Sequence, residues 1–175
     1  MAVTALGILA LMGICWLQFR AARGVPRLID PLSRMLRIPS RWEAMPTPQG
    51  LAAAFHDSGL PPMRSFLLAK VEPRPEGGAR QALADALQKA QETLPAFEAR
   101  APSKASTEMR PPHAVVVNFY FENQLPNGTG FPVAGTTVAR DIGEQTLSLT
   151  WFGPPGELDR QRWDLARILQ ESELE

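Results

Sequence analysis

The chain has 175 residues, 45% of them hydrophobic, and its 18 lysines and arginines are balanced by 18 aspartates and glutamates. This length predicts one compact domain with appendages, and the hydrophobic content excludes a disordered chain. The single cysteine excludes a disulfide framework and a zinc or iron–sulfur site built on several thiolates of this chain, while zero formal net charge argues against a nucleic-acid binder.

The first expected element is a transmembrane helix over residues 2–19, an uncharged stretch whose only polar side chains are Thr4 and Gln18. As a helix it would extend about 27 Å, close to the ~30 Å hydrocarbon thickness of a bilayer. No basic segment precedes it and no small-x-small cleavage site follows it. An uncleaved anchor is therefore favoured over a cleaved signal peptide and over a buried core helix.

The distribution of charge predicts the orientation of this anchor. Residues 20–41 contain six arginines and one aspartate, whereas residues 1–19 carry no charged side chain. The positive-inside rule then places the N-terminus outside and the C-terminal domain in the cytoplasm of a bacterial inner membrane or an equivalent compartment. Beyond residue 41 there are 12 basic and 17 acidic residues, so the zero net charge combines a positive collar with a mildly acidic domain.

The next segment, residues 20–63, is predicted to be a basic juxtamembrane region with short amphipathic helices. Asp30-Pro31 would begin one of them and Pro39 would end it, and a second is expected between Thr47 and Gly59. The alternative, left open by so short a first helix, is that its apolar face packs against the protein's own domain. The residues expected at the membrane interface or against a partner are Trp16, Arg20, Arg23, Arg27, Leu32, Arg34, Met35, Leu36, Arg37 and Arg41.

Residues 64–175 are predicted to form a soluble α+β domain in the order β-α-β-β-β-α. A strand at 65–72 precedes a helix at 79–94, and strands at 113–121, 133–140 and 146–152 precede a last helix. The strand at 113–121 is expected to be central, because both of its faces are apolar. Short connections between the strands predict a mainly antiparallel sheet, covered by two helices on one face and open on the other. The stripe that places the first helix on the sheet consists of Leu83, Leu87, Ala90, Leu94 and Phe97.

The sequence contains none of the usual catalytic constellations. The glycines of residues 127–130 are not followed by Gly-Lys-Ser/Thr, His56 and His113 lack a partner at metal-ligand spacing, and no Gly-x-Ser-x-Gly elbow occurs. No histidine lies in residues 2–19, so the anchor supplies no axial histidine ligand for a haem. We therefore expect no catalytic residue, no metal site and no cofactor, and a protein that is not an enzyme.

These features suggest a non-catalytic, single-pass accessory subunit of a larger membrane complex, such as a respiratory or photosynthetic energy-transducing assembly. Its partners would be other membrane-protein subunits, with anionic lipid headgroups at the collar. The alternative is a membrane-tethered domain that binds a small ligand, or an enzyme with a site invisible in sequence, which predicts a pocket of several hundred cubic ångströms with convergent polar groups. A third hypothesis is a peripheral lipid-binding protein that depends on Arg34, Arg37 and Arg41.

The subunit hypothesis predicts that the full-length chain, extracted in mild detergent, migrates with partner chains on native gels and in size-exclusion chromatography. The anchor and the collar supply the contact surfaces that would hold such an assembly together. Migration of the full-length chain only as a free monomer would contradict this hypothesis.

Overall fold

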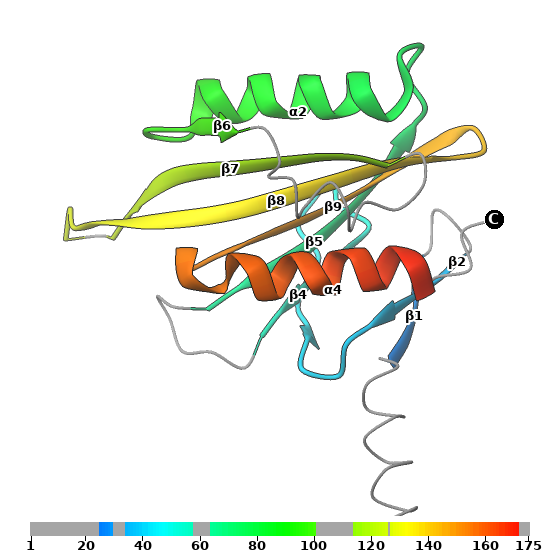
Figure 1. Cartoon of the computed structure of the whole chain (residues 1–175), viewed down its shortest axis with the longest axis horizontal. Coiled ribbons are helices and arrows are strands. Elements are labelled where there is room, and N and C mark those ends of the chain that lie inside the picture. Colours follow the sequence, from blue (N-terminus) through cyan, green and yellow to red (C-terminus); the bar gives the residue numbers. More distant parts are fainter. Residues whose placement is uncertain (1–24, 30–33, 58–63, 101–113, 126, 172–175) are drawn as a thin grey trace, which may run out of the picture.

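The computed structural model describes residues 25–29, 34–57, 64–100, 114–125 and 127–171. Its centre is a seven-stranded antiparallel sheet in the order β3-β4-β5-β9-β8-β7-β6 (Figure 1). The strands are β3 (Glu43–Ala44), β4 (Ala53–His56), β5 (Phe66–Pro73), β6 (Glu98–Arg100), β7 (Ala114–Gln124), β8 (Gly130–Ile142) and β9 (Gln145–Gly153). A separate antiparallel pair consists of β1 (Val25–Ile29) and β2 (Arg34–Ile38), and the helices are α2 (Gly78–Thr93), the 3-10 turn η2 (Pro155–Glu157) and α4 (Leu158–Glu171).

The predicted α+β fold with a mainly antiparallel sheet is confirmed. From β5 onward the chain follows the expected order of strand, helix, three strands and helix, with the short edge strand β6 as an addition. The predicted anchor, residues 2–19, lies outside the described residues. Among the helices that the structure describes, none combines the length and apolar character needed to span a membrane.

One face of the sheet carries the main core and is covered by α4. Leu147, Leu149 and Trp151 alternate along β9 and are fully buried on this face. Leu165 and Ile168 of α4 belong to the same cluster, and their spacing of three residues places them on one side of the helix. The alternation that predicted β9 from the sequence thus corresponds to a strand with one face in the core.

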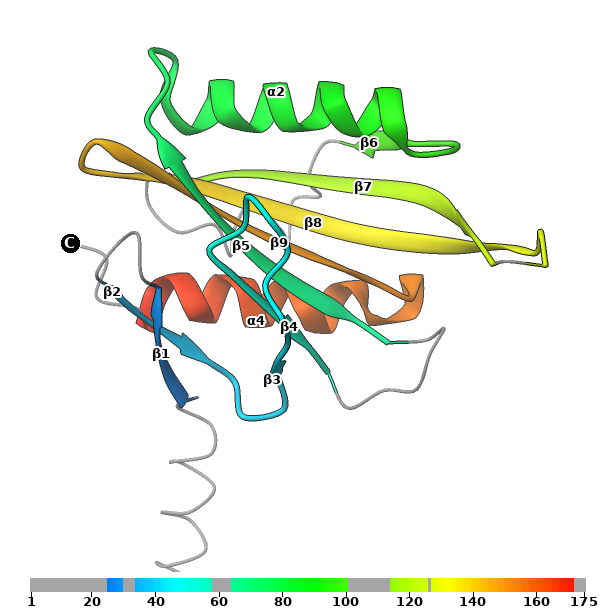
Figure 2. The ribbon, with the colours of Figure 1, turned by 180° about the vertical axis from the view of Figure 1, so that it is seen from behind.

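The two helices cover opposite faces of the sheet, so the prediction that both lie on one face is wrong (Figures 1 and 2). α2 packs on the second face through Ala79 and Leu83, which cluster with Ala139 of β8. Along β7, the four apolar residues 114–117 point alternately to the α4 cluster and to the α2 cluster. Because both faces of the sheet are apolar, each requires a cover of its own.

The central strand of the sheet is β9, and not the strand predicted at residues 113–121. That strand, β7, lies next to the edge, where it pairs with β8 along its whole length and with the three residues of β6. Its apolar residues face a helix on one side of the sheet and the main core on the other. A strand buried on both faces need not be in the middle of its sheet.

The prediction of an amphipathic helix between Asp30 and Pro39 is wrong in the part that the structure describes, because Arg34–Ile38 forms strand β2. In this strand Leu36 and Ile38 lie on either side of the half-buried Arg37, and both are buried in one cluster with Ile29 of β1. A spacing of two residues puts both side chains on one face of a strand, and pairing with β1 selects that conformation.

The second short helix, predicted between Thr47 and Gly59, is also wrong in the part that the structure describes. Ala53–His56 forms strand β4, which pairs with β5 and buries Phe55 in the main core. Alanine is a strong helix former, but intrinsic helix propensity is a small energetic preference, and the hydrogen bonds and packing offered by β5 outweigh it.

Asp164 of α4 ties the N-terminal segment to the rest of the fold. Its Oδ2 forms an ion pair with Arg41 and accepts a hydrogen bond of 3.1 Å from the indole Nε1 of Trp42. Trp42 is 3% exposed and belongs to the main core. A single carboxylate thus compensates a buried indole N–H and a half-buried guanidinium.

Replacing this carboxylate, Asp164→Ala, is expected to lower the free energy of unfolding by about 1–3 kcal/mol, because it leaves the indole N–H of Trp42 without its acceptor. The measurement is urea unfolding of the full chain in mild detergent. The matched control is Asp85→Ala, which removes an exposed carboxylate bonded to Gln81 on α2 and should change stability by less than about 0.5 kcal/mol. Equal unfolding midpoints for the two variants would contradict this role of Asp164.

Candidate functional site

The residues predicted to contact the membrane or a partner differ in their burial and in their contacts. Leu36 is fully buried in the main core, which corresponds to the alternative that this segment packs on the protein's own domain. Arg41 pairs with Asp164, Arg37 is half-buried and Arg27 is exposed on β1. Arg34 and Met35 lie on β2. The others, Trp16, Arg20, Arg23 and Leu32, lie outside the described residues.

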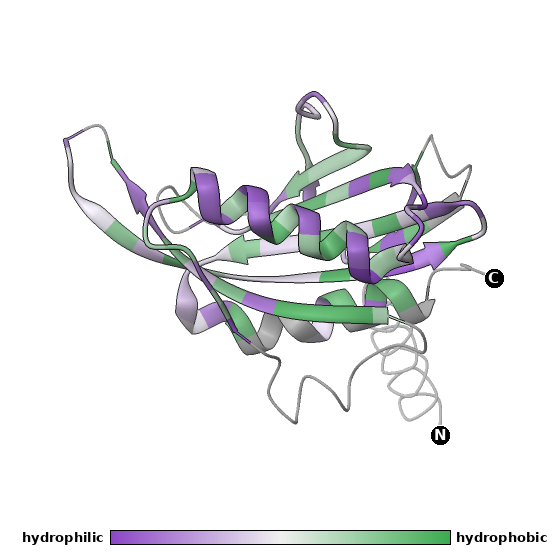
Figure 3. Ribbon diagram, turned by 90° about the horizontal axis from the view of Figure 1, so that it is seen from above, coloured by the Kyte–Doolittle hydropathy of each residue, from purple (hydrophilic) through white to green (hydrophobic). Residues whose placement is uncertain are grey.

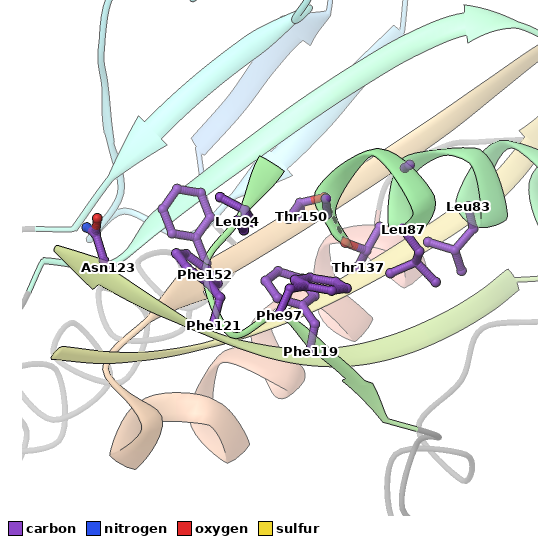
Figure 4. A pocket seen from close by; sticks show the side chains of 12 residues that line it. Leu83, Leu87, Leu94, Phe97, Phe119, Phe121, Asn123, Thr137, Thr150 and Phe152 are labelled. Carbon is purple, nitrogen blue, oxygen red and sulfur yellow. Dashed lines mark hydrogen bonds between the residues drawn. The ribbon is translucent and has the colours of Figure 1, made fainter. Parts of the chain in front are cut away.

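A cavity lies on the second face of the sheet, between α2 and strands β7, β8 and β9. Its volume is about 410 Å³, and Figure 4 shows the side chains that line it. The helix side is lined by Leu83, Ala86, Leu87, Ala90, Leu94 and Phe97. The sheet side is lined by Phe119, Phe121, Asn123, Thr137, Thr150 and Phe152. We call this space the α2 cleft.

The α2 cleft arises because α2 packs closely on the sheet only near its N-terminal end. Ala79, Ala82 and Leu83 are buried there, whereas Leu87 and Ala90 of the same stripe are half-buried. Figure 3 shows α2 crossing the sheet with hydrophobic residues interspersed among hydrophilic ones. The apolar stripe therefore continues beyond the tight contact and becomes the roof of the cleft.

A continuous series of phenylalanine rings runs along the α2 cleft, and all of them except Phe66 line it. Phe66 and Phe152 stack at 5.2 Å between ring centroids, and Phe152 lies 6.4 Å from Phe121. Phe119 is 6.2 Å from Phe121 and 5.8 Å from Phe97. Centroid separations of this size are typical of favourable aromatic pairs, so the rings support one another.

Gly135 of β8 makes room for one of these rings. A Cβ atom at this position would lie 2.1 Å from the ring of Phe119, which is shorter than any tolerable contact. The two residues are directly opposite in the pairing of β7 with β8. The absent side chain thus allows the ring of Phe119 to lie against the backbone of β8.

A turn stabilised by β6 holds Phe97 over the sheet. Glu98 and Arg100 form two hydrogen bonds with each other, and the guanidinium lies 4.7 Å from the ring centroid of Tyr120. The hydrogen bonds from Arg100 hold the pKa of the Glu98 carboxyl below its ordinary value, and the same pair raises the pKa of Arg100. Since the pKa of Glu98 is lowered on folding, its contribution to stability is present at neutral pH and is lost as the pH falls through the folded-state pKa.

Two threonines provide the polar part of the floor of the α2 cleft. Thr137 of β8 and Thr150 of β9 are directly paired across the strands, and their Oγ1 atoms are 2.9 Å apart (Figure 4). Asn123 is the third polar residue of the lining, and it is exposed. Nine of the twelve lining residues are apolar and none is charged, so the cleft suits an uncharged, largely apolar molecule.

A second, smaller hollow lies between α2 and β5 and has a volume of about 200 Å³. Lys70, Glu72, Asp85 and Lys89 surround it, and Lys70 is already paired with Glu72 at 2.5 Å. It is smaller than common ligand pockets, which span about 300–1,000 Å³. Asp85 and Lys89 are exposed and Lys70 and Glu72 are half-buried, so this hollow is an open, charged groove on the surface.

The described residues contain no group of three or more histidine, cysteine, aspartate or glutamate side chains gathered as a metal site. Nδ1 of His56 lies 2.7 Å from the backbone carbonyl of Asp57, and His113 is outside the described residues. The expected absence of a metal, a cofactor and catalytic residues stays a prediction.

Sequence reasoning found one half of the α2 cleft and missed the other. The stripe of Leu83, Leu87, Ala90, Leu94 and Phe97 was recognised, and all five residues line the cleft. The aromatic wall was missed, although Phe119 and Phe121 alternate along β7 and Phe152 ends the alternation of β9. This alternation was the available signal, but it does not tell which strands become neighbours.

The comparisons with known proteins concern the fold. No family model and no curated protein matches the sequence. Among solved structures, LpqN of Mycobacterium tuberculosis, described as involved in cell envelope biogenesis, is 16% identical with a TM-score of 0.48, and the match covers 85% of this chain and 82% of LpqN. A Bacteroides thetaiotaomicron protein is 12% identical with a TM-score of 0.53, over 87% of this chain. The match spans about half of the Bacteroides chain, 49%, and this likeness shows a shared fold alone.

Replacing the glycine under the aromatic wall, Gly135→Ala, is expected to lower the free energy of unfolding by about 1–3 kcal/mol, because the new methyl group displaces the ring of Phe119. Urea unfolding of the full chain in mild detergent measures the change. The control is Gly156→Ala, since a Cβ there has no atom within 4 Å. If Gly135→Ala is as stable as this control, the close approach of the Phe119 ring to the backbone of β8 is refuted.

Proposed function

We propose that this protein is a membrane-tethered, non-catalytic domain that binds one small apolar molecule in the α2 cleft. The observation that carries the proposal is a cavity of about 410 Å³ with nine apolar residues among its twelve lining residues. Both its volume and its composition match those of small-molecule sites in proteins, which are mostly apolar with a few placed polar groups.

The free energy of binding would come mainly from removing apolar ligand surface from water. Burial of about 200 Å² of such surface contributes on the order of 5 kcal/mol before the entropic cost of association. The rings of Phe119, Phe121 and Phe152 pack against one another, so little side-chain freedom is lost when a ligand binds.

The predicted anchor, residues 2–19, suggests that such a molecule would come from the lipid bilayer. A domain tethered at the bilayer is exposed to molecules that partition into lipid, and the basic collar of residues 20–41 would keep it near anionic headgroups. We propose that the domain lies on the cytoplasmic side, in agreement with the positive-inside rule.

The second candidate function is that of an accessory subunit of a membrane complex. It is favoured by Trp163 of α4, a large hydrophobic side chain that is 64% exposed. Tryptophan is enriched in the central contacts of protein interfaces, and α4 presents this residue on the side away from its buried face. The two functions are compatible, because Trp163 and the α2 cleft belong to opposite faces of the sheet.

Ligand binding is tested by photolabelling the full chain in bilayer nanodiscs with a long-chain alkane that carries a diazirine. Trypsin cleaves after Arg80, Lys89 and Arg100, so labelling of the roof is expected in peptides 81–89 and 90–100. Ala90→Phe fills the cleft and is expected to reduce this labelling several-fold, because Ala90 lines it.

The matched control for this experiment is Ala84→Phe, which adds the same ring on the exposed side of α2. It should leave the labelling of both roof peptides unchanged. The proposal fails if label is found only in the peptide that contains residues 2–19, or if both variants label like the unmodified chain.

A further inference from the structure

The floor of the α2 cleft carries a pair of hydroxyl groups in otherwise apolar surroundings. Thr137 is 7% exposed, and its Oγ1 lies 2.9 Å from Oγ1 of Thr150 (Figure 4). Both residues line the cleft. Across the sheet, the row of directly paired residues that contains them continues with Leu68 of β5 on one side and Val117 of β7 on the other.

The same row shows that the hydroxyls are not needed to fill space. Val117 has the shape of threonine with a methyl group in place of the hydroxyl, and it packs against the α2 cluster. A pair of valines at residues 137 and 150 would keep the floor filled and make it wholly apolar. The two hydroxyls therefore add hydrogen-bonding groups to the floor, and they are not required to fill its volume.

The pair has one proton more than its internal hydrogen bond uses. Each threonine hydroxyl has one proton to donate and two lone pairs to accept. One proton lies in the bond between Thr137 and Thr150, and neither hydroxyl has another hydrogen bond to the residues that the structure describes. The second proton is thus available to an acceptor inside the cleft, and a buried donor is stabilised by finding one.

We infer that the ligand of the α2 cleft carries an uncharged oxygen acceptor, such as the carbonyl of a ketone or an ester, which receives a hydrogen bond from the Thr137–Thr150 pair. This inference rests on the proposed function. The acceptor is uncharged because the lining contains no lysine or arginine to compensate a carboxylate, and an unpaired buried charge is strongly disfavoured. The remainder of the ligand is hydrocarbon or aromatic and contacts the phenylalanine wall.

The test compares three unlabelled competitors of equal chain length: a long-chain alkane, the corresponding methyl ketone and the corresponding carboxylate at neutral pH. Each competes with the diazirine alkane for labelling of peptides 81–89 and 90–100 in the full chain in nanodiscs. The concentration of each competitor is expressed as the amount in the bilayer per lipid molecule. Differences in partition into the bilayer then do not change the order of the competitors' potencies. With the unmodified chain the ketone is expected to compete roughly 3–10-fold better than the alkane, as one net hydrogen bond provides.

The decisive variant is the double substitution Thr137→Val and Thr150→Val, which preserves shape and removes both hydroxyls. It should reduce the ketone to the potency of the alkane and leave the alkane unchanged. The control is Thr93→Val, which removes an exposed hydroxyl at the end of α2. Circular dichroism and urea unfolding verify that each variant is folded.

The outcomes separate the inference from the proposed function. Equal competition by ketone and alkane in the unmodified chain, or an undiminished preference for the ketone in the double variant, overturns the inference and leaves the cleft as an apolar site. A carboxylate that competes as well as the ketone overturns the uncharged acceptor. Absence of labelling in both roof peptides overturns the proposed function itself.

Discussion

The sheet has two apolar faces, and this constraint shapes the rest of the molecule. Seven strands spaced about 4.8 Å apart make a surface about 29 Å wide, whereas a helix is about 10 Å wide. On one face, α4 is assisted by β1, β2 and Trp42, and the core is closed. On the other face α2 is the single covering helix of the described chain, so part of the apolar surface remains open beneath it. The α2 cleft follows from this unequal cover.

The N-terminal segment contributes to the fold more than its charge suggests. Ile29, Leu36 and Ile38 enter the main core, and β4 extends the sheet beyond β5. Arg41 and Trp42 share the carboxylate of Asp164, which connects this segment to the last helix of the chain. A basic segment that we expected at the membrane interface thus also completes the core on the α4 side.

The two faces of the sheet explain why the site was only half predictable. A helix is recognised by apolar residues that recur every three or four positions, which is a pattern within one short stretch of chain. The sequence therefore assigns Leu83, Leu87 and Ala90 to the packed side of α2. The opposite wall combines Phe152 with Phe119 and Phe121, residues about 30 positions apart that become neighbours only through the strand order. For the same reason the Thr137–Thr150 pair could not be anticipated, because register depends on which strands pair.

The sequence by itself determined the class of fold, the order of the elements after residue 64 and the identity of the apolar stripe on α2, because these depend on short-range periodicity. Only the tertiary structure decided that residues 34–38 and 53–56 are strands, that the helices lie on opposite faces and that β9 is central. Short segments have no decisive period of their own, and their conformation is set by the neighbour that supplies hydrogen bonds and buries their side chains. The α2 cleft belongs to this second group, since it is the space left between elements that the chain brings together from distant positions.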